Sequence, residues 1–455
     1  MRAAQDYPSV ASLADGYRRG TLRPREVVAR HLARIARLDP QLGAYQAVYG
    51  DDALEAADRA QAQFASGTAL HPFLGVPFAL KDICDLEGRI TTGGSLAMAD
   101  RVSPTTALIA KRLLDAGAIL LGKTKTVECA FGGWGTNQHM GTPWNPWDLG
   151  AHRVPGGSSS GTGVAVASGL APCGVGTDTG GSVRLPAGFC GLVGLKVTEG
   201  RLPNDGILPL SQTLDTPGPL ARSVRDVACM FLTMDGAEAS QIQDATEELV
   251  APLSLDGMRL GCLAQAERAV CASDVLQAYD AACEMLQDRG ATLVPFDSPN
   301  AHATQACGRI ISAEAWHNHG ALFSQADAPL DEDVRARMLV GRDMRASEYL
   351  AALDSRARDT KAFLAGIEGL DALLTPSMTL TAPRRDAVDQ NTHPGHFTRP
   401  VNYFGMCALS VPSGLAANGL PTSLQITARA HAERVALRIG AAFERARDPF
   451  DYPRL

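Results

Sequence analysis

Apolar residues recur at helical spacing near the start of the chain, before the first continuous apolar run. Residues 9–38 predict two helices, the second being PREVVARHLARIARL, and residues 52–65 predict a third. Pro24 opens that second helix, where the first helical turn accepts a proline. The run LGVPFALKDI at 74–83 is mostly apolar and predicts a buried strand. We therefore expect a helical segment followed by the first strand of a sheet.

Beyond this strand, helical and extended patterns alternate along the chain. Such a β-α-β rhythm is typical of an α/β fold with parallel pairing. The length alone would suggest about three domains, but no repeat or low-complexity linker marks a boundary, so we predict one domain over 1–455. The predicted helices are 104–117, ended by Gly117, then 162–169, 222–234, 274–289, the span 308–365 and 431–446, and the predicted strands are 118–123, 172–177, 258–263, 291–296, 370–375 and 423–428.

Glycine is concentrated in one part of the chain. Of the 45 glycines, 18 lie in residues 131–200, while the apolar share of 45% and the charged share of 20% are ordinary for a globular protein. Glycine leaves room for close backbone approach and for backbone conformations that side chains obstruct. The excess therefore marks 131–200 as a segment whose main chain has a special task.

Charge and cysteine content narrow the class of protein. The net charge is −7 and no Lys/Arg run forms a basic patch, so we expect no nucleic-acid partner. No apolar stretch of about 18 residues predicts a membrane span, and the opening MRAAQDYPSV lacks the apolar core of a signal peptide. The ten cysteines form no CxxC pair, which indicates reduced thiols in a cytoplasmic protein without a zinc site.

The first segment that could carry chemistry is PGGSSSGTG at 155–163. Thr162 follows the last glycine of a phosphate-loop-like pattern, where that motif requires lysine. The segment also contains a formal G-x-S-x-G match with Ser159 as nucleophile. Such an elbow needs a preceding strand and a histidine partner, yet the segment before it, NPWDLGAHRVP, is turn-like. The histidines that could complete a triad, none of them in a telling context, are His393, His396 and His431.

A second candidate is GVGTDTGGSVRLPAG at 174–188. The small residues at 179–182 can turn several N–H groups toward one point and so bind a developing oxyanion, with the Ser182 hydroxyl beside them. A plain glycine-rich turn is the alternative.

The third candidate is Lys81, in an apolar strand. Burial would lower its pKa and leave a neutral amine able to act as a base, unless the side chain reaches solvent from an edge strand.

Other polar groups favour ordinary structural roles. The sequences WHNH at 316–319 and HPGH at 393–396 have metal-like spacing but lack the carboxylate and third ligand of a defined site. Cys129 follows Glu128 but has no nearby histidine, so we interpret it as a packed thiol. No metal or cofactor is expected.

Taken together, Lys81 and the segments 155–163 and 174–188 resemble the amidase signature family. The resemblance covers most of the chain and is most specific over 75–223, which would be the catalytic core. Ser158 and Ser182 are 24 residues apart, as the two catalytic serines of that family are. The resemblance implies an α/β fold, with a single large domain in which a mixed central β-sheet is flanked by many α-helices.

The family's roles then carry over by position. Ser182 would be the nucleophile, Ser158 the bridging serine next to a cis peptide, and Lys81 the base. Asp178 and Arg184 would order the loop without touching substrate. Thr162 stands where relatives have a small residue, but it follows the catalytic serine and leaves the assignment intact. The oxyanion hole would consist of the N–H groups of Thr179, Gly180, Gly181 and Ser182.

The resemblance also implies a substrate pocket. Residues 300–345 would cover the site, because relatives vary there. Trp134 fits pocket lining and ordinary core equally well. The residues implied to line the acyl pocket are Phe131, Gly132, Gly133 and Trp134.

The expected activity is hydrolysis of linear C–N bonds in small or aryl amides. Carbamates (urethanes) and esters stay open because each forms the same acyl-enzyme. One alternative is the glutaminase subunit of a tRNA-dependent amidotransferase, which shares the triad, and another is a catalytically silent binding protein on the same scaffold. Intact Lys81, Ser158 and Ser182 argue against the silent protein. The sequence leaves the substrate, a homodimer and the need for a partner subunit open.

Overall fold

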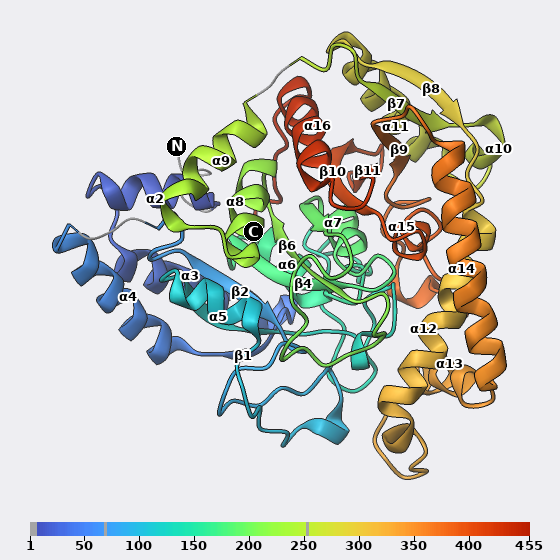
Figure 1. Cartoon of the computed structure of the whole chain (residues 1–455). Helices are drawn as coiled ribbons and strands as arrows, with labels where there is room; N and C mark the ends of the chain where they lie inside the picture. Colours follow the sequence, from blue (N-terminus) through green and yellow to red (C-terminus); the bar gives the residue numbers. More distant parts are fainter. Residues whose placement is uncertain (1–6, 68–70, 252–253) are drawn as a thin grey trace.

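Eleven strands form one continuous sheet through the middle of the computed structural model, which describes residues 7–67, 71–251 and 254–455 (Figure 1). The order across the sheet is β1-β3-β2-β4-β6-β5-β10-β11-β9-β7-β8. The expectation that the first ten residues lack the apolar core of a signal peptide concerns mainly residues 1–6, which lie outside the described residues. The strands are β1 (Tyr45–Val48), β2 (Pro77–Lys81), β3 (Ile119–Thr124), β4 (Cys173–Asp178), β5 (Val193–Lys196), β6 (Thr216–Ala221), β7 (Arg259–Leu263), β8 (Thr292–Phe296), β9 (Ala372–Pro376), β10 (Cys407–Leu415) and β11 (Pro421–Ala428).

The sheet is mixed. Parallel pairing joins β2 to both β3 and β4, and β7 to both β8 and β9. The remaining pairs are antiparallel, including the long β10–β11 ladder in the middle of the sheet. The predicted mixed α/β architecture is confirmed, although the expected parallel pairing holds only in two parts of the sheet.

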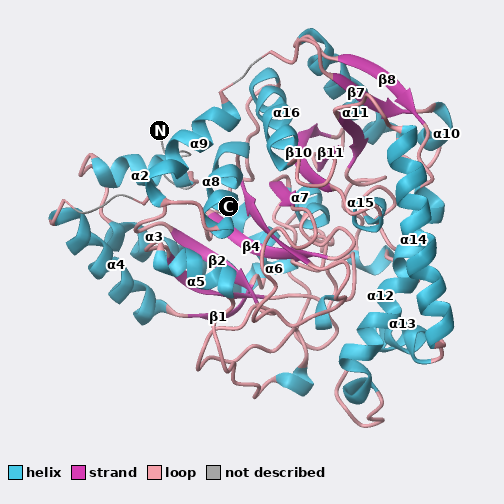
Figure 2. Cartoon of the chain, in the orientation of Figure 1, coloured by secondary structure: helices cyan, strands magenta, loops and turns pink. Residues whose placement is uncertain are grey.

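Helices surround this sheet (Figure 2). The chain runs from α2–α5 at the side of β1 to β3 across to the long helices α12–α14 at the opposite side (Figure 1). The helices are α2 (Val10–Arg18), α3 (Pro24–Leu42), α4 (Gly50–Ala65), α5 (Leu108–Asp115), α6 (Ser160–Ala167), α7 (Arg184–Cys190), α8 (Val224–Asp235), α9 (Ala239–Val250), α10 (Gln265–Arg268), α11 (Ser273–Asp288), α12 (Asn300–Phe323), α13 (Glu332–Arg342), α14 (Ala346–Gly366), α15 (Arg399–Tyr403) and α16 (Glu433–Ala446).

Each face of the sheet has its own apolar core. On one face α8, α11 and α16 contact the sheet and one another, and they belong to a large core cluster shared with α2 and α5. On the other face α6 and α7 pack together and share a second cluster with α3 and α4. Every residue of α6 and α7 is buried. These two helices follow the two segments predicted to carry chemistry, so those segments lie in the middle of the molecule.

Most predicted elements form, and the strands that were missed either contain proline or are very short. The sequence TPGPLA of β6 contains Pro217 and Pro219, which argue against a central strand. The structure accommodates them because β5 pairs only with Leu220 and Ala221, beyond both prolines. Strand β10 contains Pro412 and its register shifts there. Strands β1 and β5 are four residues each, too short for a periodic signal.

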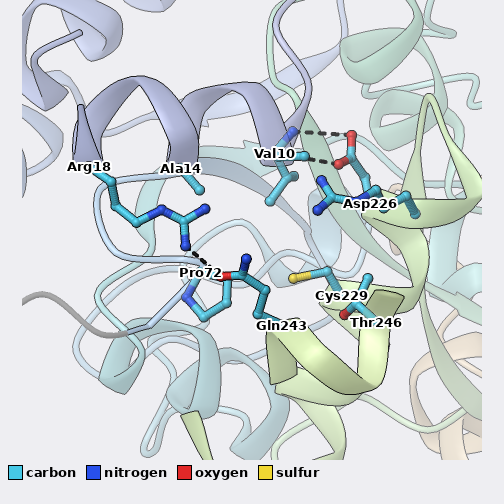
Figure 3. Close-up of a pocket in the computed structure, with 10 residues that line it drawn as sticks. Val10, Ala14, Arg18, Pro72, Asp226, Cys229, Gln243 and Thr246 are labelled. Carbon is cyan, nitrogen blue, oxygen red and sulfur yellow. Dashed lines mark hydrogen bonds between the residues drawn. The ribbon is translucent and has the colours of Figure 1, made fainter. Parts of the chain in front are cut away.

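Helix α2 is attached to the rest of the molecule through Asp226. The carboxylate of Asp226 on α8 accepts hydrogen bonds from the N–H groups of Val10 and Ala11, each 3.1 Å long (Figure 3). Arg18 donates to Gln243 on α9 at 2.5 Å. The cavity between these helices measures about 30 Å³, well below the few hundred Å³ of a ligand pocket. We conclude that this cavity is a packing feature.

Two expectations from composition can be compared with the structure. All ten cysteines are unpaired thiols, eight of them buried and two partly exposed. Within the described ranges, no helix has an apolar stretch long enough to cross a bilayer.

The close packing of β5 on β6 gives a prediction about stability. A Cβ added at Gly218 would lie 2.2 Å from the carbonyl oxygen of Leu195, a backbone atom that cannot move alone. We expect Gly218→Ala to lower the free energy of unfolding by about 1–3 kcal/mol, the usual effect of overpacking. The measurement is thermal denaturation beside Gly366→Ala, whose exposed site has no heavy atom within 4 Å of the new methyl group. Equal melting temperatures for both variants would contradict the prediction.

Candidate active site

Lys81 lies at the end of β2 in the interior of the sheet, and its side chain is fully buried. Its Nζ donates to the hydroxyls of Ser158 and Thr177, each at 2.7 Å. Burial lowers the pKa of Lys81 to about 7, although nearby acidic groups, among them Asp215, partly oppose the shift. The amine can therefore lose its proton near neutral pH, and the alternative of an edge-strand lysine that reaches solvent is wrong.

Ser158 stands on a loop of closely packed backbone just before α6. The Gly157–Ser158 peptide bond is cis, as the family resemblance implied. A Cβ at Gly157 would lie 2.6 Å from the backbone nitrogen of Gly135, so only glycine fits there. The carbonyl of Ser158 accepts from the Thr126 hydroxyl at 2.9 Å. These contacts hold the Ser158 hydroxyl against Lys81.

Ser182 lies between β4 and α7 and is 8% exposed. The N–H of Ser159 donates to the Ser182 carbonyl at 3.3 Å, which joins the loops of the two serines. In the described part of the chain, no group forms a hydrogen bond with the Ser182 hydroxyl. The structure thus joins Lys81 to Ser158 by side chains and joins Ser158 to Ser182 through the adjoining backbone.

The four N–H groups predicted for an oxyanion hole are not equivalent. Gly181 donates its N–H to the Asp178 carboxylate at 2.8 Å. The N–H groups of Thr179, Gly180 and Ser182 have no acceptor among the residues that the structure describes. Three of the four donors are therefore open, and the fourth is held by Asp178.

Asp178 and Arg184 organise this segment from beneath. Both side chains are fully buried and form an ion pair of 2.9 Å. The Asp178 carboxylate also accepts from the N–H of Val183 at 3.1 Å and from Asn402 at 3.0 Å. Burial opposes its ionisation, but Arg184 and Asn402 outweigh burial and hold its pKa well below the ordinary value. The loop-ordering role expected for both residues agrees with these contacts.

Thr179 has a second anchor in Asp215. The Thr179 hydroxyl donates to the Asp215 carboxylate at 2.5 Å, and the N–H of Ser211 donates to it at 2.9 Å. Burial raises the pKa of Asp215 to about 6, although these hydrogen bonds partly offset the rise. Asp215 therefore fixes the residue that presents the first of the three open N–H groups.

Two further buried lysines show how Lys81 differs from its neighbours. Lys123 on β3 forms a buried ion pair of 2.8 Å with Asp82. Lys196 donates to the carbonyls of Val197 and Met406 at 2.6 and 2.9 Å, and burial lowers its pKa to about 8. Lys123 also donates to the Thr91 hydroxyl at 2.8 Å. Of the three, Lys81 is the one whose hydrogen-bond partners among the described residues are hydroxyl groups without a carboxylate or a carbonyl.

The competing nucleophiles have structural roles. The Ser159 hydroxyl donates to the carbonyl of Thr177 at 3.3 Å and accepts from the Thr177 N–H at 3.2 Å. The residues directly before Ser159 do not form a strand. The nucleophile-elbow alternative is therefore not supported. Burial raises the pKa of the Cys129 thiol well above its ordinary value, as expected for a packed thiol. Within the described residues, no group of three or more His, Cys, Asp or Glu side chains is arranged to hold a metal ion.

A cavity of about 390 Å³ adjoins these loops. It is lined by all four residues of the predicted acyl pocket, 131–134, together with residues of α12 and α13 from the predicted cover. The Gly157 N–H donates to the Gly133 carbonyl at 2.8 Å, which joins the cavity wall to the Ser158 loop. Trp134 lines this cavity and also packs in a core cluster with Phe189.

Sequence reasoning missed several residues of the site. Thr177 is the second hydrogen-bond partner of Lys81. Its position near the end of β4 is the weak sequence signal that could have identified it. Asp215 and Asn402 lie far from the motifs they support, and nothing local identifies them. Arg399, which lines the cavity, is missed for the same reason.

Comparison with known proteins gives a consistent result. A family model described as Amidase matches residues 26–437. The A-type subunit of the glutamyl-tRNA(Gln) amidotransferase from Geobacter metallireducens is 33% identical, with 96% of this chain and 97% of the relative covered. A 2-amino-5-chloromuconic acid deaminase from Comamonas testosteroni is 35% identical, with 92% and 93% covered. The structure of native peptide amidase from Stenotrophomonas maltophilia is similar at a TM-score of 0.84 and 29% identity, with 98% of each chain covered.

The buried pair under the loop predicts a large effect on stability. Arg184→Met would leave the Asp178 carboxylate buried without its cation, which typically lowers stability by about 3–5 kcal/mol. We expect a correspondingly lower midpoint in urea denaturation. Arg384→Met removes an arginine of an exposed pair with Asp386 and should leave the midpoint nearly unchanged. Similar midpoints for both variants would show that the buried pair is not essential to the fold.

Proposed function

The chain belongs to the amidase family, which implies an amidohydrolase acting on C–N bonds, and from that premise we propose a serine hydrolase of linear amides. Ser182 is the proposed nucleophile, Ser158 the bridging serine and Lys81 the base. The observation that carries the proposal is the 2.7 Å hydrogen bond between the fully buried Lys81 amine and the Ser158 hydroxyl. A serine hydroxyl is a weak nucleophile and requires such a base.

The acylation step follows from these positions. Neutral Lys81 takes the proton of Ser158, which takes the proton of Ser182 as the Ser182 oxygen attacks the acyl carbon. The Ser182 side chain is 8% exposed and its hydroxyl has no hydrogen-bond partner in the described residues, so in this proposal the hydroxyl turns toward Ser158 or a substrate. The relay then returns a proton to the leaving amine, so that a neutral amine departs and the acyl group stays on Ser182.

Charge developing on the carbonyl oxygen is met by main-chain donors. We assign this role to the N–H groups of Thr179, Gly180 and Ser182, because the N–H of Gly181 is held by Asp178. Losing one such donor typically reduces the rate about 100- to 1000-fold. Water then attacks the acyl-enzyme with the same relay, and amides, carbamates and esters share this second half of the reaction.

The substrate's acyl part would occupy the 390 Å³ cavity. Residues 131–134 form the wall nearest the Ser158 loop, and we propose that α12 and α13, within 300–345, cover it. This volume lies in the range of small-molecule sites. Small or aryl amides are therefore the proposed substrates. The cytoplasmic location and the homodimer stay predictions.

A second candidate function is the glutaminase subunit of a tRNA-dependent amidotransferase. It is favoured by relatives of that name that match almost the whole chain at 33–34% identity. The distinguishing experiment is a panel of anilides, aliphatic amides, carbamates and glutamine, assayed on the purified chain alone. Amide hydrolysis without a partner supports the stand-alone hydrolase, and turnover of glutamine only with a partner subunit supports the second candidate.

The nucleophile assignment predicts the effect of two serine substitutions. Ser182→Ala removes the attacking oxygen and should abolish turnover of every accepted amide. Ser159→Ala removes a hydroxyl that contacts only the backbone of Thr177, so turnover should persist. Product release by each variant checks this, with circular dichroism to confirm folding. Persistent turnover in Ser182→Ala, or its loss only in Ser159→Ala, would refute the assignment.

The proposed base predicts a pH dependence. Because the pKa of Lys81 is lowered to about 7, its neutral fraction falls about tenfold for each pH unit below that value. We expect kcat/KM to rise with pH up to about 7 and then level off. Lys81→Met should reduce kcat/KM about 100- to 10,000-fold and remove this rising limb, whereas Lys111→Met, at an exposed ion pair, should keep it. A limb that survives Lys81→Met would identify another base.

A further inference from the structure

The cavity beside the candidate active site carries an excess of positive charge. Three arginines line it, Arg309, Arg337 and Arg399, against one carboxylate, Asp333. That carboxylate already accepts a hydrogen bond of 2.8 Å from Gln138. None of the three arginines forms an ion pair within the part of the chain that the structure describes. A cavity with this lining favours an anionic ligand.

Arg399 differs from Arg337 in lacking hydrogen-bond partners among the described residues, and from the exposed Arg309 in having a buried Nε. Arg337 donates to the carbonyl of Phe131 at 2.9 Å and to that of Gln390 at 3.4 Å, and Arg309 is exposed to solvent. The Nε of Arg399 is buried with no acceptor, and its other side-chain nitrogens have none in the described ranges. An arginine side chain stays protonated in proteins, and a buried charged donor without a partner is costly. The missing acceptor therefore points to a ligand.

The position of Arg399 ties this ligand to the reacting group. A Cβ at Gly180 would lie 3.1 Å from Cγ of Arg399, so the side chain packs directly on the oxyanion segment. The neighbouring Thr398 hydroxyl donates to the Gly180 carbonyl at 2.8 Å. On its other side the guanidinium meets α12, where a Cβ at Gly308 would lie 3.2 Å from Nη1. An anionic group bound by Arg399 would therefore be only a few covalent bonds away, along the substrate, from an acyl carbon held at Gly180.

We propose that the acyl part of the substrate carries a carboxylate and that Arg399 binds it. Guanidinium and carboxylate match in geometry and form charge-assisted hydrogen bonds. This assignment rests on the proposed function and makes Arg399 a specificity-determining residue of the amidase. It narrows the substrate class from small amides in general to monoamides of dicarboxylic acids.

The test compares amides that differ only in one charged group. Glutaramic acid and pentanamide have the same chain, with a terminal carboxylate in the first and a methyl group in the second. Succinamic acid and butanamide form a shorter pair. The readout is kcat/KM from ammonia release by the purified full-length chain. We expect at least one acid to exceed its neutral partner about 10- to 100-fold, the usual worth of a hydrogen bond to a charged group.

Variants assign this preference to one side chain. Arg399→Gln should bring the ratio of the two kcat/KM values close to one, and Arg399→Lys, which keeps the charge, should retain part of it. Arg342→Gln is the matched control, because Arg342 on neighbouring α13 is exposed and pairs only with Asp343. The control should leave the ratio as in the wild type. A ratio that is unchanged in Arg399→Gln would overturn the assignment.

A binding measurement keeps the test independent of folding and turnover. Titration calorimetry on Ser182→Ala, with Arg399 intact, should show tighter binding of the acid than of its neutral partner by a similar factor. Equal binding, or wild-type hydrolysis of the neutral amides at equal or higher kcat/KM, would overturn the carboxylate site and leave the amidase standing. Tight acid binding without hydrolysis of any amide would support the site and contradict the proposed function.

Discussion

The buried amine of Lys81, held between two hydroxyl groups and facing no carboxylate, is the interaction on which the candidate site depends. The chain has only six lysines, and three of them are fully buried. Lys123 contacts the Asp82 carboxylate as well as the Thr91 hydroxyl, and Lys196 donates to backbone carbonyls, which can only accept hydrogen bonds. A hydroxyl can both accept and donate, and Lys81 alone among the three contacts hydroxyl groups with neither a carboxylate nor a carbonyl as a further partner in the described residues.

The surrounding structure keeps that arrangement in place. Lys81 ends β2 in the interior of the sheet, and Thr177 beside it is the last residue but one of β4, the parallel neighbour of β2. Glycine is required at Gly157 because a Cβ there would lie 2.6 Å from the backbone nitrogen of Gly135, and at Gly181 a Cβ would lie 2.3 Å from the Thr398 hydroxyl. The glycine excess of residues 131–200 therefore reflects close contacts of backbone as well as open N–H donors.

The sequence predicts what is local and misses what is distant. Lys81, Ser158 and Ser182 belong to recognisable motifs, and the helices with a strong apolar face were predicted close to their observed bounds. Strand β6 was missed because its prolines disfavour a strand unless the neighbouring ladder stops short of them. Asn402 and Arg399 approach the site from more than 200 residues away, so only the folded chain reveals them. The motif predicted that the N–H of Gly181 would bind the oxyanion. That this N–H donates to Asp178 depends on loop geometry, which the motif does not show.

The proposed relay requires Lys81 to be a neutral amine at physiological pH, and its pKa can be measured directly. With only six lysines, carbon-13 labelling at Cε gives few enough NMR signals to assign by single substitution, including Lys81→Met. A signal assigned to Lys81 that titrates near pH 7 is the predicted result. A Lys81 signal that titrates near the ordinary lysine pKa of about 10 would contradict the role of Lys81 as the base.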